Sequence, residues 1–437
     1  MTSLTVILTT LSCLLLGAHA LRTGDWGLTL AWVGTAGLVV LRRAWVRIVL
    51  IAALLFGVLA WVQVSTGLIQ VRMAFGVDWG RLALIMSGVV LITLLATGLL
   101  AGEPGRRFFP KGEDQAGPVA AIFLLTVAVL GFLHTRVDLS LLLVERYFPG
   151  WGWLQIFALG VYGAWIGGMM LDEKKAPRVR PRIWAFFSLV FFTQLGLGLL
   201  GMERMLMTGD LHLPVPALIM AGPIFRGHGF FMVILFVSTV ALVGPAWCSH
   251  LCYIGAWDDR AGRLRHKRPQ GGLPGWAWHV RWAIFLLVPL AALAFRTAGM
   301  PGLTAVWAAA VFGLVGVGIM VWLSRRRGMM VHCSAYCPIG LLGNLLGRLT
   351  PWRLRIASGC TRCMACTRVC RYNALNRNHL ERGRPGLSCT LCGDCVGICP
   401  GREISYGFLH LSPHSSRRLF VVLVVFLHAV FLAVARI

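Results

Sequence analysis

Apolar segments recur along nearly the whole chain, with short polar loops between them. A membrane-spanning helix needs about 20 predominantly apolar residues, because the hydrocarbon core of a bilayer is about 30 Å thick. Segments close to this length predict an all-α polytopic membrane protein with about 11 transmembrane helices. The expected spans lie at residues 5–20, 26–41, 47–68, 81–101, 118–134, 153–171, 183–201, 229–248, 280–296, 303–323 and 419–435.

The pattern breaks once, before the last apolar segment. From about residue 351 the chain becomes polar and rich in cysteine and arginine, and the run at 419–435 then returns to apolar residues. This change predicts three parts: a polytopic transmembrane domain at residues 1–350, a small cytoplasmic domain at 351–415, and a C-terminal transmembrane helix at 416–437. No Lys or Arg precedes Arg22, so the first segment is expected to be a retained helix and not a cleaved signal peptide.

Composition and charge agree with a membrane protein. Hydrophobic residues make up 57% of the 437, and charged residues only 13%. The net charge of +25 comes from basic residues that gather in the loops after every second span, for example Arg325, Arg326 and Arg327. Since Lys and Arg favour cytoplasmic loops, this charge predicts orientation in membrane lipid and no nucleic-acid partner. We expect a multi-pass protein of the bacterial cytoplasmic membrane, with the N-terminus and the cysteine-rich domain inside and the C-terminus outside.

Eight of the 13 cysteines form two runs of identical spacing, C-x2-C-x2-C-x3-C, and the second run ends in Cys399-Pro400. This is the spacing of a bacterial ferredoxin with two 4Fe–4S clusters, in which the fourth cysteine of each run ligates the other cluster. Zinc knuckles and disulfides are the alternatives. The predicted ligands are Cys360, Cys363, Cys366 and Cys399 for one cluster, and Cys389, Cys392, Cys395 and Cys370 for the other.

Four further cysteines form two C-x3-C pairs at the expected cytoplasmic ends of spans: Cys248 with Cys252, and Cys333 with Cys337. An i, i+4 spacing would place both thiols of a pair on one helix face. Together the pairs offer four soft ligands for a further iron–sulfur centre or another thiophilic metal. Redox-active thiols and buried unligated thiols remain alternatives. The last cysteine, Cys13, lies inside an apolar run and is expected to be a core residue.

One outward loop, at about residues 202–229, combines polar side chains with an apolar, proline-rich centre at 213–225 that is too short to span. Polar groups near membrane depth are candidate functional residues. We therefore name Glu203, His212 and His228 as candidates for a quinone site, with an ordinary external connection as the alternative.

Two C-x3-C pairs followed by two ferredoxin runs resemble the membrane polyferredoxins related to NapH, NosR and CcoG. The resemblance covers residues 245–400, and it is architectural only over residues 1–200. It departs at Tyr253, where the family usually has proline, and at Arg371, which replaces the proline after the first run. The resemblance implies electron transfer at a membrane in a respiratory context.

These features predict an integral-membrane iron–sulfur electron-transfer subunit. It would pass electrons between the quinone pool, or a cytoplasmic donor, and a partner respiratory redox enzyme. The alternative is an assembly factor that binds or reduces a metal such as copper for a respiratory metalloenzyme. No haem-attachment, Walker A or dinucleotide motif indicates a substrate site of its own. Basic residues around the ferredoxin runs predict an acidic partner surface, namely Arg362, Arg368, Arg371, Arg382, Arg384 and Arg402.

Overall fold

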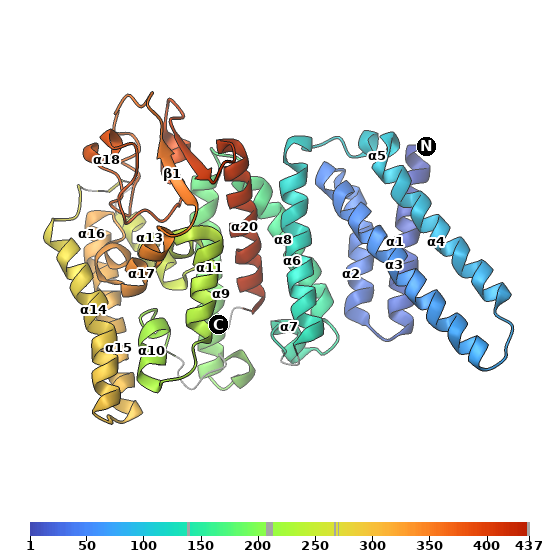
Figure 1. Cartoon of the computed structure of the whole chain (residues 1–437), viewed down its shortest axis with the longest axis horizontal. Helices are drawn as coiled ribbons and strands as arrows, with labels where there is room; N and C mark the ends of the chain where they lie inside the picture. Colours follow the sequence, from blue (N-terminus) through green and yellow to red (C-terminus); the bar gives the residue numbers. More distant parts are fainter. Residues whose placement is uncertain (138–139, 207–212, 266–267, 270, 435–437) are drawn as a thin grey trace. The chain divides into compact units, whose positions relative to one another are not determined.

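The computed structural model describes residues 1–137, 140–206, 213–265, 268–269 and 271–434 (Figure 1). The chain forms two compact units, Met1–Gly168 and Met169–Ile437. The division falls near the end of α8, and each unit is described by itself. The predicted domain boundaries at 350 and 415 do not coincide with it and remain predictions.

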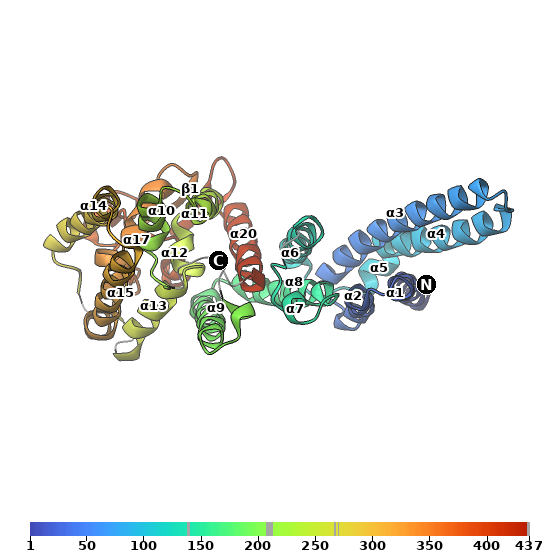
Figure 2. The same cartoon turned by 90° about the horizontal axis from the view of Figure 1, so that it is seen from below.

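The first unit consists of helices whose neighbours along the chain run antiparallel. α1 lies beside α2, and α3 lies beside α4, in both views (Figures 1 and 2). Asp25 caps α2, because its carboxylate accepts a hydrogen bond from the N–H of Leu28 at 2.8 Å. Cys13 is fully buried, as predicted. The helices are α1 (Thr2–Arg22), α2 (Trp26–Gly37), α3 (Ala44–Ala74), α4 (Gly80–Ala101), α5 (Glu103–Phe108), α6 (Ala116–Arg136), α7 (Leu143–Tyr147) and α8 (Gly152–Met170).

Within the described residues, ten helical stretches, one of them the interrupted run Phe231–Arg265, are long and apolar enough to cross a membrane, so this is a multi-pass membrane protein by length and composition. The expected span at 26–41 is not among them, because α2 has 12 residues and continues only as a 3₁₀ turn, Leu38–Leu41. Gly27 N–H nevertheless bonds to Gly150 O at 3.0 Å, and Ala44 N–H bonds to Lys111 O at 2.9 Å. Residues 26–41 thus run between Gly150, which follows α6 in the chain, and Lys111, which precedes it. They connect the regions at the two ends of α6, and this supports the predicted count of about 11 without establishing it.

The second unit contains the remaining helices and a two-stranded sheet. α10 has nine residues and a length of about 14 Å, so it does not span. The helices are α9 (Ala176–Leu199), α10 (Leu218–Arg226), α11 (Phe231–Val243), α12 (Trp247–His250), α13 (Tyr253–Arg265), α14 (Trp276–Thr297), α15 (Gly302–Ile319), α16 (Arg325–Arg327), α17 (Pro338–Gly347), α18 (Arg377–Glu381), α19 (Asp394–Ile398) and α20 (Pro413–Val434), and the strands are β1 (Trp352–Ile356) and β2 (Ile404–Phe408).

The sheet closes the cysteine-rich segment and fixes it at one end of the helices of this unit (Figure 1). β1 and β2 pair antiparallel from Trp352 opposite Phe408 to Ile356 opposite Ile404, so the two ferredoxin runs form one long excursion between the strands. The indole N–H of Trp352 donates to Leu242 O, at the end of α11, at 2.7 Å. Phe408 N–H donates to Ser416 Oγ of α20 at 3.1 Å. Both ends of the segment are therefore held against membrane helices.

Candidate metal centres

The two ferredoxin runs follow the same backbone path. Residues at two equivalent loop positions have left-handed conformations: Arg362 (φ 56°) and Met364 (φ 61°) in the first run, and Leu391 (φ 56°) and Gly393 (φ 79°) in the second. Positive φ is uncommon for residues other than glycine, and such conformations cluster at functional loops. The repeat of spacing in the sequence is thus also a repeat of shape.

The fourth cysteine of the second run joins the first three of the first run. The Cys366 thiol interacts electrostatically with Cys360, Cys399 and Cys363, and burial raises its pKa to about 11. Cys363 is exposed, whereas Cys360 and Cys399 are half-buried. The four thiols that we predicted for one cluster therefore converge, and they do so near the surface.

The converse set converges deeper in the unit. Cys395 interacts with Cys392, Cys389 and Cys370. Burial raises the pKa of Cys389 to about 12, so this thiol would stay protonated unless a metal displaces the proton. Cys370, Cys389 and Cys392 pack, together with Cys333 of a C-x3-C pair, against one apolar cluster that contains Trp184 and Tyr372.

The C-x3-C pairs lie at helix breaks and not on a continuous helix face, so the expectation from i, i+4 spacing was wrong. In the first pair, Cys252 N–H bonds to Trp247 O, five residues earlier, at 3.0 Å. In the second pair, Cys337 N–H bonds to His332 O, also five residues earlier, at 2.8 Å. Each turn is therefore wider than an α-helical turn. The helix ends there, and the second thiol does not continue on the same helix face as the first.

A glycine three residues after each pair allows this turn. A Cβ at Gly255 would lie 2.9 Å from Cys248 O, and a Cβ at Gly340 would lie 2.9 Å from Cys333 O. Each second cysteine then stands at the start of a helix. Tyr253 begins α13 where Pro338 begins α17, so Tyr253 takes the position of the family's proline without disturbing the helix start.

The second thiol of each pair accepts backbone hydrogen bonds from the helix that it precedes. Gly255 N–H lies 3.4 Å from Cys252 Sγ, and the N–H groups of Ile339 and Gly340 bond to Cys337. N–H groups at a helix N-terminus favour a thiolate over a thiol. For Cys337, the effect of burial is larger than that of these N–H groups, and the pKa stays raised. The N–H groups favour a thiolate at this position, but a cation is needed to stabilise it.

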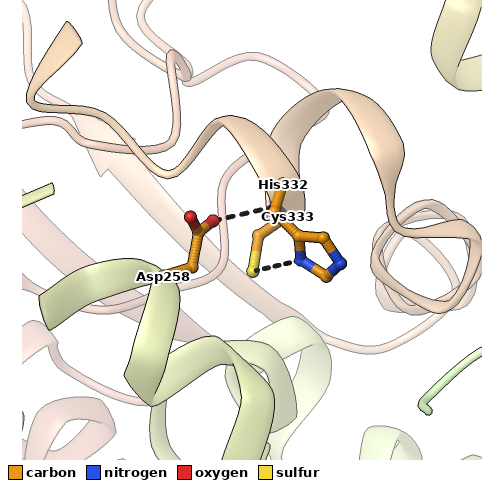
Figure 3. Close-up of side chains that lie close together, drawn as sticks. All are labelled: Asp258, His332 and Cys333. Atoms are coloured by element: carbon orange, nitrogen blue, oxygen red, sulfur yellow. Dashed lines mark hydrogen bonds between the residues drawn. The ribbon is translucent and has the colours of Figure 1, made fainter. Parts of the chain in front are cut away.

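The four thiols of the two pairs meet in one buried site. The Cys333 thiol interacts with Cys337, Cys252 and Cys248, and burial raises its pKa well above the usual value, with Asp258 as the next cause. Asp258 Oδ2 accepts the Cys333 N–H at 2.9 Å, and His332 Nδ1 lies 4.0 Å from Cys333 Sγ (Figure 3). One ligand atom each of Asp258, His332 and Cys333 lies within 4.8 Å of the other two.

Direct hydrogen bonds join this site to the surroundings of the deeper cysteine set. Ser249, inside the first pair, donates to Thr390 O, inside the run, at 2.8 Å. The Tyr372 hydroxyl, two residues after Cys370, donates to Cys248 O at 3.3 Å. Trp184 donates to Cys252 O at 2.7 Å. The C-x3-C site and the deeper cysteine set are therefore neighbours held by short polar contacts.

A buried ion-pair network, which the sequence did not predict, lies beside both sites. Arg180, 1% exposed, donates to Asp394 Oδ1 at 3.2 Å and Oδ2 at 2.8 Å, and it also donates to Ser249 O at 3.1 Å. Asp259 and Arg263 complete the network, with an Arg263–Asp259 distance of 2.6 Å. An acidic residue between two cysteines of a run, Asp394, was the available signal.

The predicted quinone residues are not brought together. Glu203 is exposed in a short turn after α9, His228 is exposed after α10, and His212 lies outside the described residues. Within the described part of the chain, no hydrogen bond or ion pair joins Glu203 to His228.

An apolar cavity of about 350 Å³ lies instead between α10, α14 and α15. Phe312, in its wall, stacks on Tyr336 with ring centres 4.5 Å apart, and the Tyr336 hydroxyl donates to Phe312 O at 2.8 Å. Tyr336 precedes Cys337. Among the described residues that line it, Arg226 is the one that carries a charge.

Comparison with protein-family models gave a match to a 4Fe–4S binding domain, over residues 225–270 and 309–357. These ranges contain both C-x3-C pairs and end before Cys360, and they cover less than a quarter of the chain. Neither curated proteins nor solved structures gave a significant match. The match, with the apolar helices, defines the class: a ferredoxin-type iron–sulfur protein of the membrane that fits electron transfer. A closer relation to NapH, NosR or CcoG is not established.

The residues present fit iron–sulfur clusters. Each of the three sets gathers four thiols, and the second and third sets contain no exposed thiol, so a free thiolate there would be unfavourable. Thiolate is the ligand that these clusters use. Chain geometry and donor chemistry thus agree with the family match.

Proposed function

We propose that the protein is an integral-membrane electron-transfer subunit with two 4Fe–4S clusters in the ferredoxin segment and a third metal centre at the C-x3-C pairs. When bound, such clusters exchange single electrons. The chain supplies the ligands Cys360, Cys363, Cys366 and Cys399; Cys389, Cys392, Cys395 and Cys370; and Cys248, Cys252, Cys333 and Cys337.

The observation that carries this proposal is the order of the three thiol sets in space. The first reaches the surface at Cys363, the second has no exposed cysteine, and the third is joined to the second through the Ser249–Thr390 and Tyr372–Cys248 hydrogen bonds. A series of neighbouring redox sites that begins at a surface and ends among membrane helices suits transfer between a soluble carrier and the membrane.

We further propose that the surface at Cys363 docks an acidic redox partner. Arg362, Arg368 and Arg402 are exposed, and their charge would steer an acidic protein to this face. Arg371 does not belong to this surface, because it is buried and donates to Gly262 O at 3.1 Å. With the positive-inside pattern, the surface would face the cytoplasm of a bacterial cell, and the C-terminus would lie outside.

The membrane acceptor or donor in this proposal is a quinone. The cavity between α10, α14 and α15 supports it, because its wall residue Phe312 contacts Tyr336, the neighbour of Cys337. Apolar cavities with few polar groups are the usual sites of such ligands. The cavity is a better candidate than Glu203 or His228, which are exposed and apart.

The test is anaerobic reoxidation by quinone. Purified protein is reduced with a stoichiometric amount of dithionite and mixed with a soluble naphthoquinone, and cluster absorbance is followed in time. We expect the wild type and a Cys13→Ser control to reoxidise alike. The Cys248→Ser/Cys333→Ser variant should keep its ferredoxin clusters and reoxidise much more slowly. Equal rates in all three would exclude the C-x3-C site from the path.

One observation favours a second function, the handling of a metal for another enzyme. Asp258, His332 and Cys333 offer oxygen, nitrogen and sulfur ligands at one place, and soft thiolates suit Cu(I). This assembly-factor alternative predicts that Cu(I) added anaerobically to the intact protein binds in a fixed ratio that Cys333→Ser abolishes. Copper that is bound equally by both proteins would count against it.

A further inference from the structure

A buried arginine lies beside the C-x3-C thiols. Arg281, 2% exposed, is near the start of α14, a helix whose other buried residues are only Ala277 and Ala292. A Cβ on Gly340 would lie 3.9 Å from Arg281 Nη2 and 3.7 Å from the Cβ of Cys337. The guanidinium therefore lies against the turn that carries the second pair.

The electrostatic neighbours of Arg281 are thiols of the C-x3-C pairs. Its electrostatic partners are Cys248, Cys337 and Cys333. Its Nε is buried and has no hydrogen-bond partner among the described residues, and no carboxylate there forms an ion pair with it. A buried guanidinium is unfavourable unless an anion balances it.

Arg180, nearby in the same unit, shows how this chain otherwise buries a guanidinium. It lies 2.8 Å from Asp394 and 3.7 Å from Asp259, and Arg263 makes the network two cations against two anions. Arg281 has no such carboxylate within the residues that the structure describes. Asp258 accepts the Cys333 N–H at the thiol site, and it is not among the electrostatic partners of Arg281. Among the described residues, the groups that can supply negative charge to Arg281 are the thiols of Cys248, Cys333 and Cys337.

Neutral thiols or a disulfide would leave the charge of Arg281 unbalanced. Four thiolates around a metal would balance it, since thiolate-ligated metal centres carry net negative charge. We propose that Arg281 is the counter-ion of an anionic metal centre held by Cys248, Cys252, Cys333 and Cys337, and that it raises the redox potential of this centre. This rests on the third centre of the proposed function and identifies the residue that tunes it. The family match at 225–270 and 309–357 does not include Arg281.

The physical effect has a definite sign. A cation beside a redox centre stabilises the reduced, more negative state, so its removal lowers the midpoint potential. Arg281 would act on the centre without being a ligand. It is a positioning residue. The midpoint potential of the centre therefore reports its role more directly than the turnover of a partner enzyme does.

The experiment compares full-length wild type, Arg281→Gln, Arg281→Lys and Arg296→Gln after anaerobic purification. Arg296 is an exposed control on the same helix that donates to Ile224 O. Iron, sulfide and zinc are assayed, and the C-x3-C centre is titrated by EPR. The two ferredoxin clusters, at about eight irons, report that each variant has folded.

We expect the wild type, Arg281→Lys and Arg296→Gln to hold about twelve irons. Arg281→Gln should either lose the additional irons or lower the midpoint potential of the C-x3-C centre. The expected shift corresponds to a tenfold change in the redox equilibrium constant, which is about 59 mV for one electron. The inference is overturned if Arg281→Gln keeps both the irons and the potential of the Arg296→Gln control. It is also overturned if Arg281→Lys loses the centre as completely as glutamine does. About eight irons in the wild type, with no other metal bound at the C-x3-C thiols, would refute the third centre itself, and this inference with it.

Discussion

At the scale of single residues, the fourth cysteine of each ferredoxin run decides which thiols form a set. Cys399 joins Cys360, Cys363 and Cys366, while Cys370 joins the other run. We predict that Cys399→Ser and Cys360→Ser remove the same EPR signal, and that Cys370→Ser and Cys389→Ser remove the other. Each variant should lose about four irons. Matching signals within a run, Cys360 with Cys370, would contradict the crossed arrangement.

Asp394 links the second run to the membrane helices through Arg180. Removal of one partner from a buried ion pair costs about 3–5 kcal/mol, because the other charge is left buried and less well compensated. Asp394→Asn should therefore lower the thermal stability of the purified protein strongly and impair assembly of the adjoining cluster. Glu381→Gln is the control, because Glu381 pairs with Arg377 at an exposed site, at 3.5 Å, where such pairs contribute little. Similar melting temperatures for the two variants would refute the structural role of Asp394.

At the scale of elements, the two C-x3-C turns share one backbone geometry, with the same wide hydrogen bond and a glycine at the same position. The turn is tight at Gly255, where a Cβ would also lie 2.6 Å from the Trp184 ring, and at Gly340. Gly255→Ala and Gly340→Ala should each cost about 1–3 kcal/mol through overpacking, and each should deplete the additional irons. Gly318→Ala in α15 has open space around it and should leave stability and iron unchanged. Loss of iron in only one of the two turn variants would argue against equivalent turns.

The elements also show what sequence can and cannot predict. Apolar length was enough for the long helices, since bilayer thickness fixes it, whereas the crossed ligand sets that the spacing of the runs indicates stay a prediction. Spacing alone gave the wrong local structure for Cys248 and Cys252, because i, i+4 describes a regular helix and the wide turn depends on Gly255 packing against Trp184. The approach of Arg281 to the thiols was not predictable, because it depends on how α14 packs against α17.

At the scale of the whole molecule, the surface at Cys363 is where a soluble partner would reach the chain. Arg362→Glu/Arg402→Glu should slow reduction by an acidic one-electron carrier, such as a flavodoxin, and should weaken the salt dependence of the rate, because steering is screened by ions. Arg106→Glu/Arg107→Glu makes the same change in net charge at another exposed site and should have little effect. Equal slowing by both double variants would point to net charge and not to a docking surface.

The most direct test of the account is the anaerobic iron and acid-labile sulfide content of the purified full-length protein, with EPR of the reduced sample. Three sets of four thiols predict about twelve irons, matching sulfide and three signals, with the C-x3-C signal absent from Cys248→Ser/Cys333→Ser. Magnetic interaction between that signal and the second ferredoxin cluster should be visible, since Ser249 and Thr390 bring the two sites together. Few irons, with zinc in the thiol sites, would contradict the electron-transfer function.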